Sequence, residues 1–214
     1  MLNMRTLLRG AAAAALVFVI AFAASSSAAD ILDDWASVKA PPPPELKPVM
    51  LDSPTTALLI MDMGKMTCSR PSCVAMIPNV KRLHDGLEAA GGMVWYALTG
   101  QSTAADYVDS TTLPREGEWE IRPGPDKFLD SDLDERLKAH HIKTVIVCGV
   151  SFQGVGVGTA TEAAERGYKV IVPIDCLSSD DLYAAQYSAW HLSKSGPGSV
   201  TRAVTLTRST MVKF

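Results

Sequence analysis

The hydrophobic pattern of the chain alternates between two kinds of segment from residue 55 onward. Short continuous apolar runs are typical of strands buried on both faces of a sheet, and longer stretches between them carry apolar residues at helical spacing. The pattern predicts strands over 55–61, 93–98, 118–122, 143–149, 168–175 and 199–207, and helices over 73–90, 131–141, 158–167 and 178–196. Because strands alternate with helices and hairpin signals are absent, we expect a three-layer α/β/α fold with a mostly parallel, six-stranded sheet.

Residues at the ends of the predicted helices support these boundaries. Ser131 is a residue type that caps helix N-termini, so we expect it to begin the helix over 131–141. Gly167 ends the helix over 158–167, and Gly91 follows the helix over 73–90, because glycine adopts the left-handed conformation that closes helices.

The first 29 residues have the three parts of a secretory signal peptide. Arg5 and Arg9 form a positive start, residues 11–24 are an unbroken apolar run, and Ala29 ends a small-residue exit. The alternative is a single membrane anchor, but the run is short for a span. We therefore expect export to the periplasm or the medium, cleavage after Ala29, and no stable membrane span afterwards.

Residues 30–54 form a proline-rich arm before a single domain that we expect over residues 55–214. Four consecutive prolines at 41–44 fix an extended segment with few hydrogen-bond donors. Such an arm either spaces the domain from the membrane-proximal end or lies across the domain surface. The length left after cleavage suits one domain better than two.

The net charge indicates which kinds of partner the protein binds, and the cysteines indicate whether its compartment is oxidising. The formal net charge is −3 with a pI near 5.8, and no basic cluster is present, so nucleic acid is not an expected partner. Cys68 and Cys73 stand close together around Pro71, so a small disulfide loop is plausible in an oxidising compartment. Cys148 and Cys176 lie in or just after apolar strands, where we expect buried, inert thiols.

Ligands of parallel sheets bind beyond the carboxyl ends of the strands, so residues there are the candidates for chemistry. Asp62 directly follows the first strand, where partial burial would favour its neutral form and make it an acid or a base near neutral pH; the alternative is a structural cap. Gly154, Gly156 and Gly158 form a glycine-rich bend with G-x-G-x-G spacing after the fourth strand. Two interpretations are open for this bend: its backbone amides bind an anion, or its glycines only allow the backbone to pack closely. The spacing of the glycines differs from that of a nucleotide-binding loop and so disfavours nucleotide binding.

Metal and serine-hydrolase chemistry have no signature in this chain. The four histidines form no ligand constellation, so we expect no metal and no cofactor. A G-x-S-x-G nucleophile elbow is also absent from the sequence.

Four stretches together resemble the isochorismatase-like (cysteine hydrolase) superfamily, which includes isochorismatases, nicotinamidases and carbamoylsarcosine amidases. The resemblance covers residues 55 to about 207. It is carried by "ALLIMDM", "IPNVKRLHDGLEAAGGMVWY", "GPDKFLDSDLDERLKAHHIKTVIVCGV" and "TATEAAERGYKVIVPID". The resemblance implies a hydrolase acting on a small molecule, and a homo-oligomer, since members commonly assemble with sites near subunit interfaces.

The resemblance also implies a catalytic set of an aspartate, a lysine and a nucleophilic cysteine, which this chain matches only in part. The aspartate matches Asp62. The position of the lysine holds Arg122, while Lys127 stands beside Phe128, and arginine keeps the charge without shuttling a proton. The position of the cysteine holds Val155, which has no nucleophile.

Two functions fit a chain with this set. In the first, the protein is a hydrolase without a covalent step, as the resemblance implies for isochorismatases that cleave a vinyl ether with the aspartate as general acid. Asp62 would protonate the substrate, Arg122 or Lys127 would balance a substrate carboxylate, and the bend would orient it. The bend residues concerned are Ser151, Gly154, Val155 and Gly156. In the second, the protein is a periplasmic ligand-binding pseudoenzyme that kept the pocket and lost turnover.

Overall fold

The computed structural model describes residues 30–99, 103–106, 114, 118–121 and 124–214. Residues 41–214 form one compact unit, and the described residues before them, 30–40, belong to a separate one. In the first unit the described part, 30–40, contains a single 3₁₀ turn, Trp35–Ser37, with no buried side chain. The sheet and its helices belong to the second unit.

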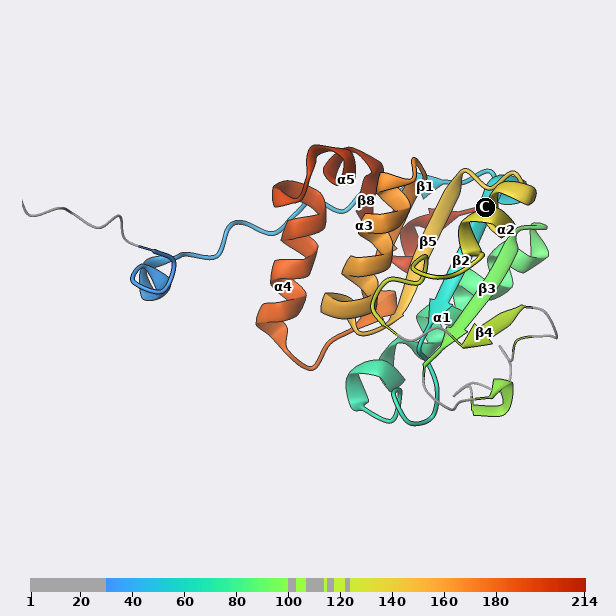
Figure 1. The fold of residues 1–214 in the computed structure, drawn as a ribbon, viewed down its shortest axis with the longest axis horizontal. Helices are drawn as coiled ribbons and strands as arrows, with labels where there is room; N and C mark the ends of the chain where they lie inside the picture. Colours follow the sequence, from blue (N-terminus) through green and yellow to red (C-terminus); the bar gives the residue numbers. More distant parts are fainter. Residues whose placement is uncertain (1–29, 100–102, 107–113, 115–117, 122–123) are drawn as a thin grey trace, which may run out of the picture. The chain divides into compact units, whose positions relative to one another are not determined.

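The second unit is built on a sheet of parallel strands, as the hydrophobic pattern predicts. Six strands follow one another in the order β4-β3-β2-β5-β6-β8, and the short strand β7 pairs with β5. Figure 1 shows β2 and β5 side by side in this sheet, and they are hydrogen-bonded neighbours. The strands are β2 Thr56–Met61, β3 Met93–Leu98, β4 Trp119–Ile121, β5 Thr144–Val150, β6 Lys169–Pro173, β7 Leu177–Ser178 and β8 Val204–Thr207.

Helices cover both faces of the sheet, which confirms the three-layer arrangement. On one face, α1 packs on a core that includes Leu58 and Ile60 of β2; on the other, α2, α3 and α5 pack on a core that includes Leu59. Successive strand residues point to opposite faces, so one strand serves both cores. The helices are α1 Pro71–Ala89, α2 Leu133–Ala139, α3 Val157–Glu165, α4 Leu182–Trp190 and α5 Gly198–Ala203, with π-helical turns over Phe152–Gly156 and His191–Ser195.

The last predicted strand, 199–207, is wrong in its first half. Gly198–Ala203 is the helix α5, and the strand β8 begins only at Val204. The helix follows Pro197, whose fixed φ suits the residue before a helical turn, and it buries Val200. The sequence after Pro197 mixes β-branched and polar residues, which suit a strand, but the proline favours the start of a helical turn there.

The expected cap at Ser131 is also wrong in its role. Helix α2 begins at Leu133, with Asp132 in the cap position. The hydroxyl of Ser131 donates to the carbonyl of Lys127 at 2.8 Å and accepts the N–H of Leu133 at 3.2 Å. Ser131 thus joins the start of α2 to the loop that carries Lys127.

The segment after residue 41 lies across the surface of its own unit. The N–H of Lys47 donates to the carbonyl of Leu206 at 3.0 Å, and β1 Val49–Met50 pairs in parallel with β9 Val212–Lys213. Leu46 packs against the core. Of the two arrangements that the sequence left open for the arm, these contacts belong to the second.

Within the described residues, no helix combines the length and the apolar character that crossing a membrane requires. The expected signal peptide, residues 1–29, lies outside the described residues.

Candidate active site

Asp62 is held at the carboxyl end of β2 by its backbone. Its N–H donates to the carbonyl of Ala97 in β3 at 2.8 Å, and the hydroxyl of Thr67 donates to its carbonyl. Its φ of 56° lies in the left-handed region, which aspartate adopts more readily than most residues. These constraints turn the chain at the strand end and fix where the Asp62 carboxylate can reach.

The ammonium group of Lys127 forms an ion pair with this carboxylate. The Nζ atom lies 2.8 and 3.0 Å from the two carboxylate oxygens and 3.0 Å from the carbonyl oxygen of Gly124. Lys127 is fully buried, and Asp62 keeps 8% of its surface exposed. These three acceptor oxygens lie within hydrogen-bond distance of the buried Nζ atom and offset the cost of burying it.

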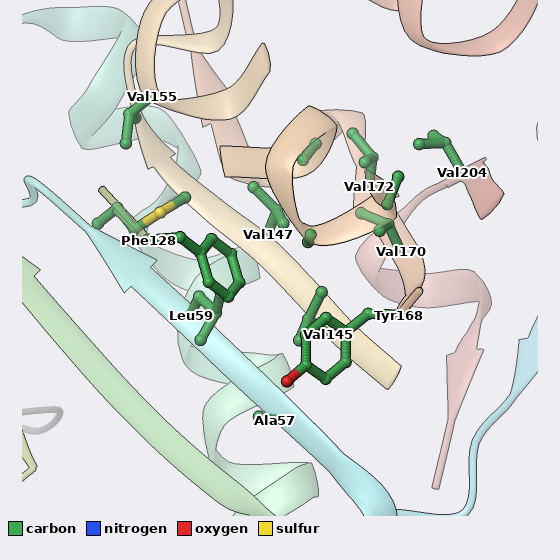
Figure 2. Packing of buried hydrophobic residues seen from close by; sticks show 14 of the residues in the cluster. Ala57, Leu59, Phe128, Val145, Val147, Val155, Tyr168, Val170, Val172 and Val204 are labelled. Atoms are coloured by element: carbon green, nitrogen blue, oxygen red, sulfur yellow. The ribbon is translucent and has the colours of Figure 1, made fainter. Parts of the chain in front are cut away.

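The loop that carries Lys127 is anchored next to it in the core. Asp126 accepts the N–H of Phe128 through its side chain at 2.8 Å, which tightens the turn. The ring of Phe128 stacks with Tyr168 at a centroid distance of 6.1 Å, and Figure 2 shows it beside Leu59 and Val147. Burial of this ring fixes the adjacent lysine in place.

Helix α3 supports the same loop from the other side. The hydroxyl of Thr159, fully buried, accepts the N–H of Lys127 at 3.3 Å and donates to the carbonyl of Pro125 at 3.2 Å. A side chain at Gly158 would place its Cβ 2.6 Å from the Pro125 carbonyl oxygen, so the helix touches the loop there. The sequence gives no reason to expect Thr159 at the site, and it indicates Gly158 only as part of the glycine-rich bend, because the chain separates both residues from Lys127.

Burial sets the protonation of the Asp62 carboxyl. It raises the pKa of Asp62 above its usual value, and the hydrogen bond and positive charge of Lys127 offset part of that rise. The carboxyl therefore holds its proton more tightly than an exposed aspartate does. A raised pKa moves the group towards the range in which it can donate and recover a proton near neutral pH.

The glycine-rich bend after β5 lies at the same edge of the sheet. Gly149 pairs with Met61 in register, and a Cβ at Gly149, whose φ is 139°, would stand 2.0 Å from the Met61 carbonyl oxygen. Only glycine lets the two strand ends approach this closely. The bend and Asp62 are thus carried by adjacent strands.

Inside the bend, some polar groups have hydrogen-bond partners and others have none among the described residues. The amides of Gly154 and Gly156 both donate to the carbonyl of Ser151, at 3.2 and 3.0 Å, so they already have an acceptor. Val155 is buried, with 3% of its surface exposed. The hydroxyl of Ser151 is half-buried and has no hydrogen-bond partner among the described residues, and a Cβ on Gly154 would lie 2.9 Å from it.

None of the chain's four cysteines, all within the described residues, presents a free thiol at the surface. Cys68 and Cys73 form a disulfide with their Cα atoms 5.1 Å apart. Cys148 and Cys176 are fully buried. Burial raises the pKa of the Cys176 thiol well above its ordinary value, and a hydrogen bond with Cys148 adds to the rise, so Cys176 does not act readily as a thiolate.

The structure brings together part of the set of residues expected at the site. Asp62 and Lys127 form one pair, and the bend residues follow the neighbouring strand. Arg122 lies outside the described residues. Two surface cavities, of about 520 and 580 Å³, lie elsewhere, one against α1 and the C-terminus and one between residues 41–44 and α4. Among the residues whose placement is described, no three metal-ligating side chains converge.

Comparison with known sequences identifies related proteins over most of this unit. A family model described as Isochorismatase domain matches residues 56–204. The uncharacterized isochorismatase family protein YwoC of Bacillus subtilis (strain 168) is similar to this chain, with 26% identity over 153 residues. That match covers 60% of this chain and 80% of the relative.

Comparison with solved structures finds the same fold. The nicotinamidase SaPncA from Staphylococcus aureus is similar at a TM-score of 0.63 and 16% identity, over 72% of this chain and 99% of that one. An N-carbamoylsarcosine amidase from Thermoplasma acidophilum is similar at a TM-score of 0.59 and 20% identity, over 72% of this chain and 96% of that one. Both likenesses show a shared architecture.

Proposed function

The chain belongs to the isochorismatase family of hydrolases, and we propose that it hydrolyses a small molecule by proton transfer from Asp62 with no covalent cysteine step. The observation that carries this proposal is the buried pair of Asp62 and Lys127 at the carboxyl end of the central strand. A carboxyl with a raised pKa beside a fixed cation is suited to general acid–base work.

The proposed step uses the two side chains in sequence. The protonated carboxyl of Asp62 gives its proton to the terminal vinyl carbon of the substrate, and the carboxylate left behind is stabilised by the ammonium of Lys127 at 2.8 Å. Water adds to the oxocarbenium carbon so formed and returns one proton to Asp62. The resulting hemiketal then collapses: its C–O bond to the ring breaks, its hydroxyl proton passes to the leaving oxygen, and a keto acid and an alcohol are released. A vinyl ether such as isochorismate suits this route because protonation at carbon activates it without a nucleophile on the protein.

The absence of a usable thiol separates this route from covalent catalysis. Val155 stands at the bend, Cys148 and Cys176 are buried, and the other two cysteines are paired. The hydroxyl of Ser151 at the bend has no partner among the described residues, so we assign it to hydrogen bonding with the substrate. Amide substrates that depend on an acyl-enzyme are expected to react slowly or not at all.

Turnover against a substrate panel tests this proposal. Isochorismate, nicotinamide and N-carbamoylsarcosine are each incubated with purified protein, and products are followed by NMR while intact mass reports any covalent adduct. We expect many turnovers of isochorismate with no adduct. A stable acyl adduct, or turnover confined to the amides, would contradict the proposal.

The bend without a thiol also fits a second candidate, a ligand-binding protein without turnover, since binding contacts survive loss of a nucleophile. Calorimetry with the same three compounds distinguishes the two: saturable binding without product supports this candidate, and product formation in catalytic excess excludes it.

We further propose that the protein is exported. The apolar run at 11–24 with its small-residue exit supports this, and so does the disulfide between Cys68 and Cys73, a bond that persists in oxidising compartments. Cell fractionation with intact-mass measurement tests it, and we expect a chain beginning at Asp30. Cytoplasmic protein that retains residue 1 would contradict export.

A further inference from the structure

The cavity between residues 41–44 and α4 lies at the carboxyl edge of the sheet. Its volume of about 580 Å³ is within the range of cavities that hold small molecules. Ile174 and Arg208, the residues that directly follow β6 and β8, both line it. Because ligands of parallel sheets bind beyond the carboxyl ends of the strands, the cavity lies where this fold places binding sites.

The cavity is separate from the pair of Asp62 and Lys127. In the strand order β4-β3-β2-β5-β6-β8, Asp62 follows β2, whereas Arg208 follows β8 at the end of the sheet. Neighbouring strands are about 4.8 Å apart, so about 14 Å of sheet separates the two strand ends. Figure 1 shows α4, one wall of the cavity, at the side of the sheet where β8 lies. A ligand in the cavity would therefore contact residues other than those proposed for hydrolysis.

The walls of the cavity are apolar and are fixed in place without a ligand. One wall consists of the four prolines at 41–44, and α4 contributes the indole ring of Trp190. The proline segment is held because the N–H of Lys47 donates to the carbonyl of Leu206 at 3.0 Å and Leu46 packs against the core. Proline rings have little conformational freedom to lose, and an indole is a flat apolar surface. Such walls favour a flat aromatic group at a low entropic cost.

The cavity presents one positive charge to a ligand. Arg208 is the charged side chain among the described residues that line it, and the side-chain amide of Gln186 is a second polar group. Glu45, between Pro44 and Leu46, is exposed and does not line the cavity. The guanidinium of Arg208 has no hydrogen-bond or ion-pair partner within the part of the chain that the structure describes. It is therefore available to a bound anion.

The form of this positive charge selects among anions. A guanidinium presents its N–H groups as a planar fork that matches the two oxygens of a carboxylate. The backbone that carries Arg208 is fixed, because the N–H of Met211 donates to its carbonyl at 2.8 Å. A dicarboxylate or a phosphate ester would bring a second negative charge to apolar walls without a partner, which costs free energy. The cavity thus suits one carboxylate attached to an apolar body.

We propose that this cavity binds a small aromatic monocarboxylate, with its carboxylate on Arg208 and its ring against Trp190 and the prolines at 41–44. The site goes beyond the hydrolysis proposed for Asp62 and does not depend on it.

Calorimetry of purified protein with naphthoate as the probe tests the proposal on the wild type. We expect one molecule to bind per chain. The uncharged carboxamide of the same ring keeps the apolar body and removes the charge, so it is expected to bind at least about tenfold more weakly. No saturable binding of naphthoate, or equal binding of the carboxamide, would overturn the proposal without any variant being made.

Charge-matched variants test which residues bind the probe. Arg208→Gln is expected to weaken naphthoate binding at least about tenfold. Arg202→Gln removes the same charge from an exposed position on α5 that does not line the cavity, and it is expected to bind as the wild type does. Asp62→Asn is also expected to keep wild-type affinity. Binding that is lost in Asp62→Asn and kept in Arg208→Gln would place the probe in the hydrolytic site and overturn the proposal.

The NMR signals of the indole N–H groups locate the probe even if Arg208→Gln does not fold. Trp190→Phe identifies the signal of Trp190, which is expected to shift as naphthoate is added. Trp95, with 1% of its surface exposed, is the matched control, and its signal is expected to stay in place. A Trp190 signal that does not move at saturating naphthoate, or an equal shift of both signals, would overturn the assignment of the cavity.

Discussion

The ammonium of Lys127 lies 2.8 and 3.0 Å from the two carboxylate oxygens of Asp62, although 65 residues separate them along the chain. The lysine is fully buried, so the two charges depend on each other. Removing either partner would leave an uncompensated buried group, which costs more than the pair itself contributes.

The first prediction concerns this dependence. Lys127→Met is expected to lower the free energy of unfolding by up to about 3–5 kcal/mol at neutral pH, because the buried Asp62 carboxyl loses the cation that balances it and must either take up a proton or stay charged without a partner. Combining it with Asp62→Leu is expected to cost less than the sum of the two single changes. Urea unfolding of all four proteins measures the coupling. Additive costs would show that the pair does not act as a unit.

The second prediction concerns pH. The pKa of Asp62 is raised in the folded protein, chiefly by burial, so the folded state binds this proton more tightly than the unfolded chain. The contribution of this group to stability is fully present below the pKa of the unfolded chain and is lost as the pH rises through the raised pKa of the fold. The unfolding free energy of wild type minus that of Asp62→Asn is therefore expected to fall with pH across that window and then level off. A difference that rises with pH would show a lowered pKa.

A third prediction uses two glycines with positive φ. Gly149 has φ of 139° and faces the backbone of Met61, whereas Gly167 has φ of 92° and open space around it. Gly167→Ala is expected to cost about 1–2 kcal/mol, the strain of the left-handed conformation alone. Gly149→Ala is expected to cost well above that, because the Cβ must push β5 away from β2. Thermal unfolding of the two variants compares them, and equal costs would contradict the close approach of the strands.

The sheet could be predicted from the sequence because buried parallel strands are written as continuous apolar runs. Thr56–Met61 and Thr144–Val150 fall within a residue of the expected boundaries. The strand β1, only two residues long, carries no periodicity to detect, and its partner lies at the other end of the chain. The helical turn of α5 was missed because Val200 and Thr201 suit strands by propensity, and packing after Pro197 overrode that preference.

The candidate site could be predicted only in part. Asp62 is visible in the sequence as a carboxylate that ends an apolar run. Spacing along the loop pointed to Arg122 and Lys127 as alternatives, and the sequence could not choose between them because loop geometry decides which side chain reaches the strand end. Thr159 and Ser131, which hold the Lys127 backbone, are bound to it by contacts that carry no pattern in the sequence.

The most direct test of the proposed chemistry is the turnover number of Asp62→Asn for isochorismate, measured beside wild type and Cys148→Ala. The account predicts that Asp62→Asn loses at least about a hundredfold, the usual contribution of a general acid, while its affinity for the compound changes little. Cys148→Ala, at a buried strand position, is predicted to keep wild-type turnover. Unchanged turnover in Asp62→Asn, or its loss in a folded Cys148→Ala, would contradict the account.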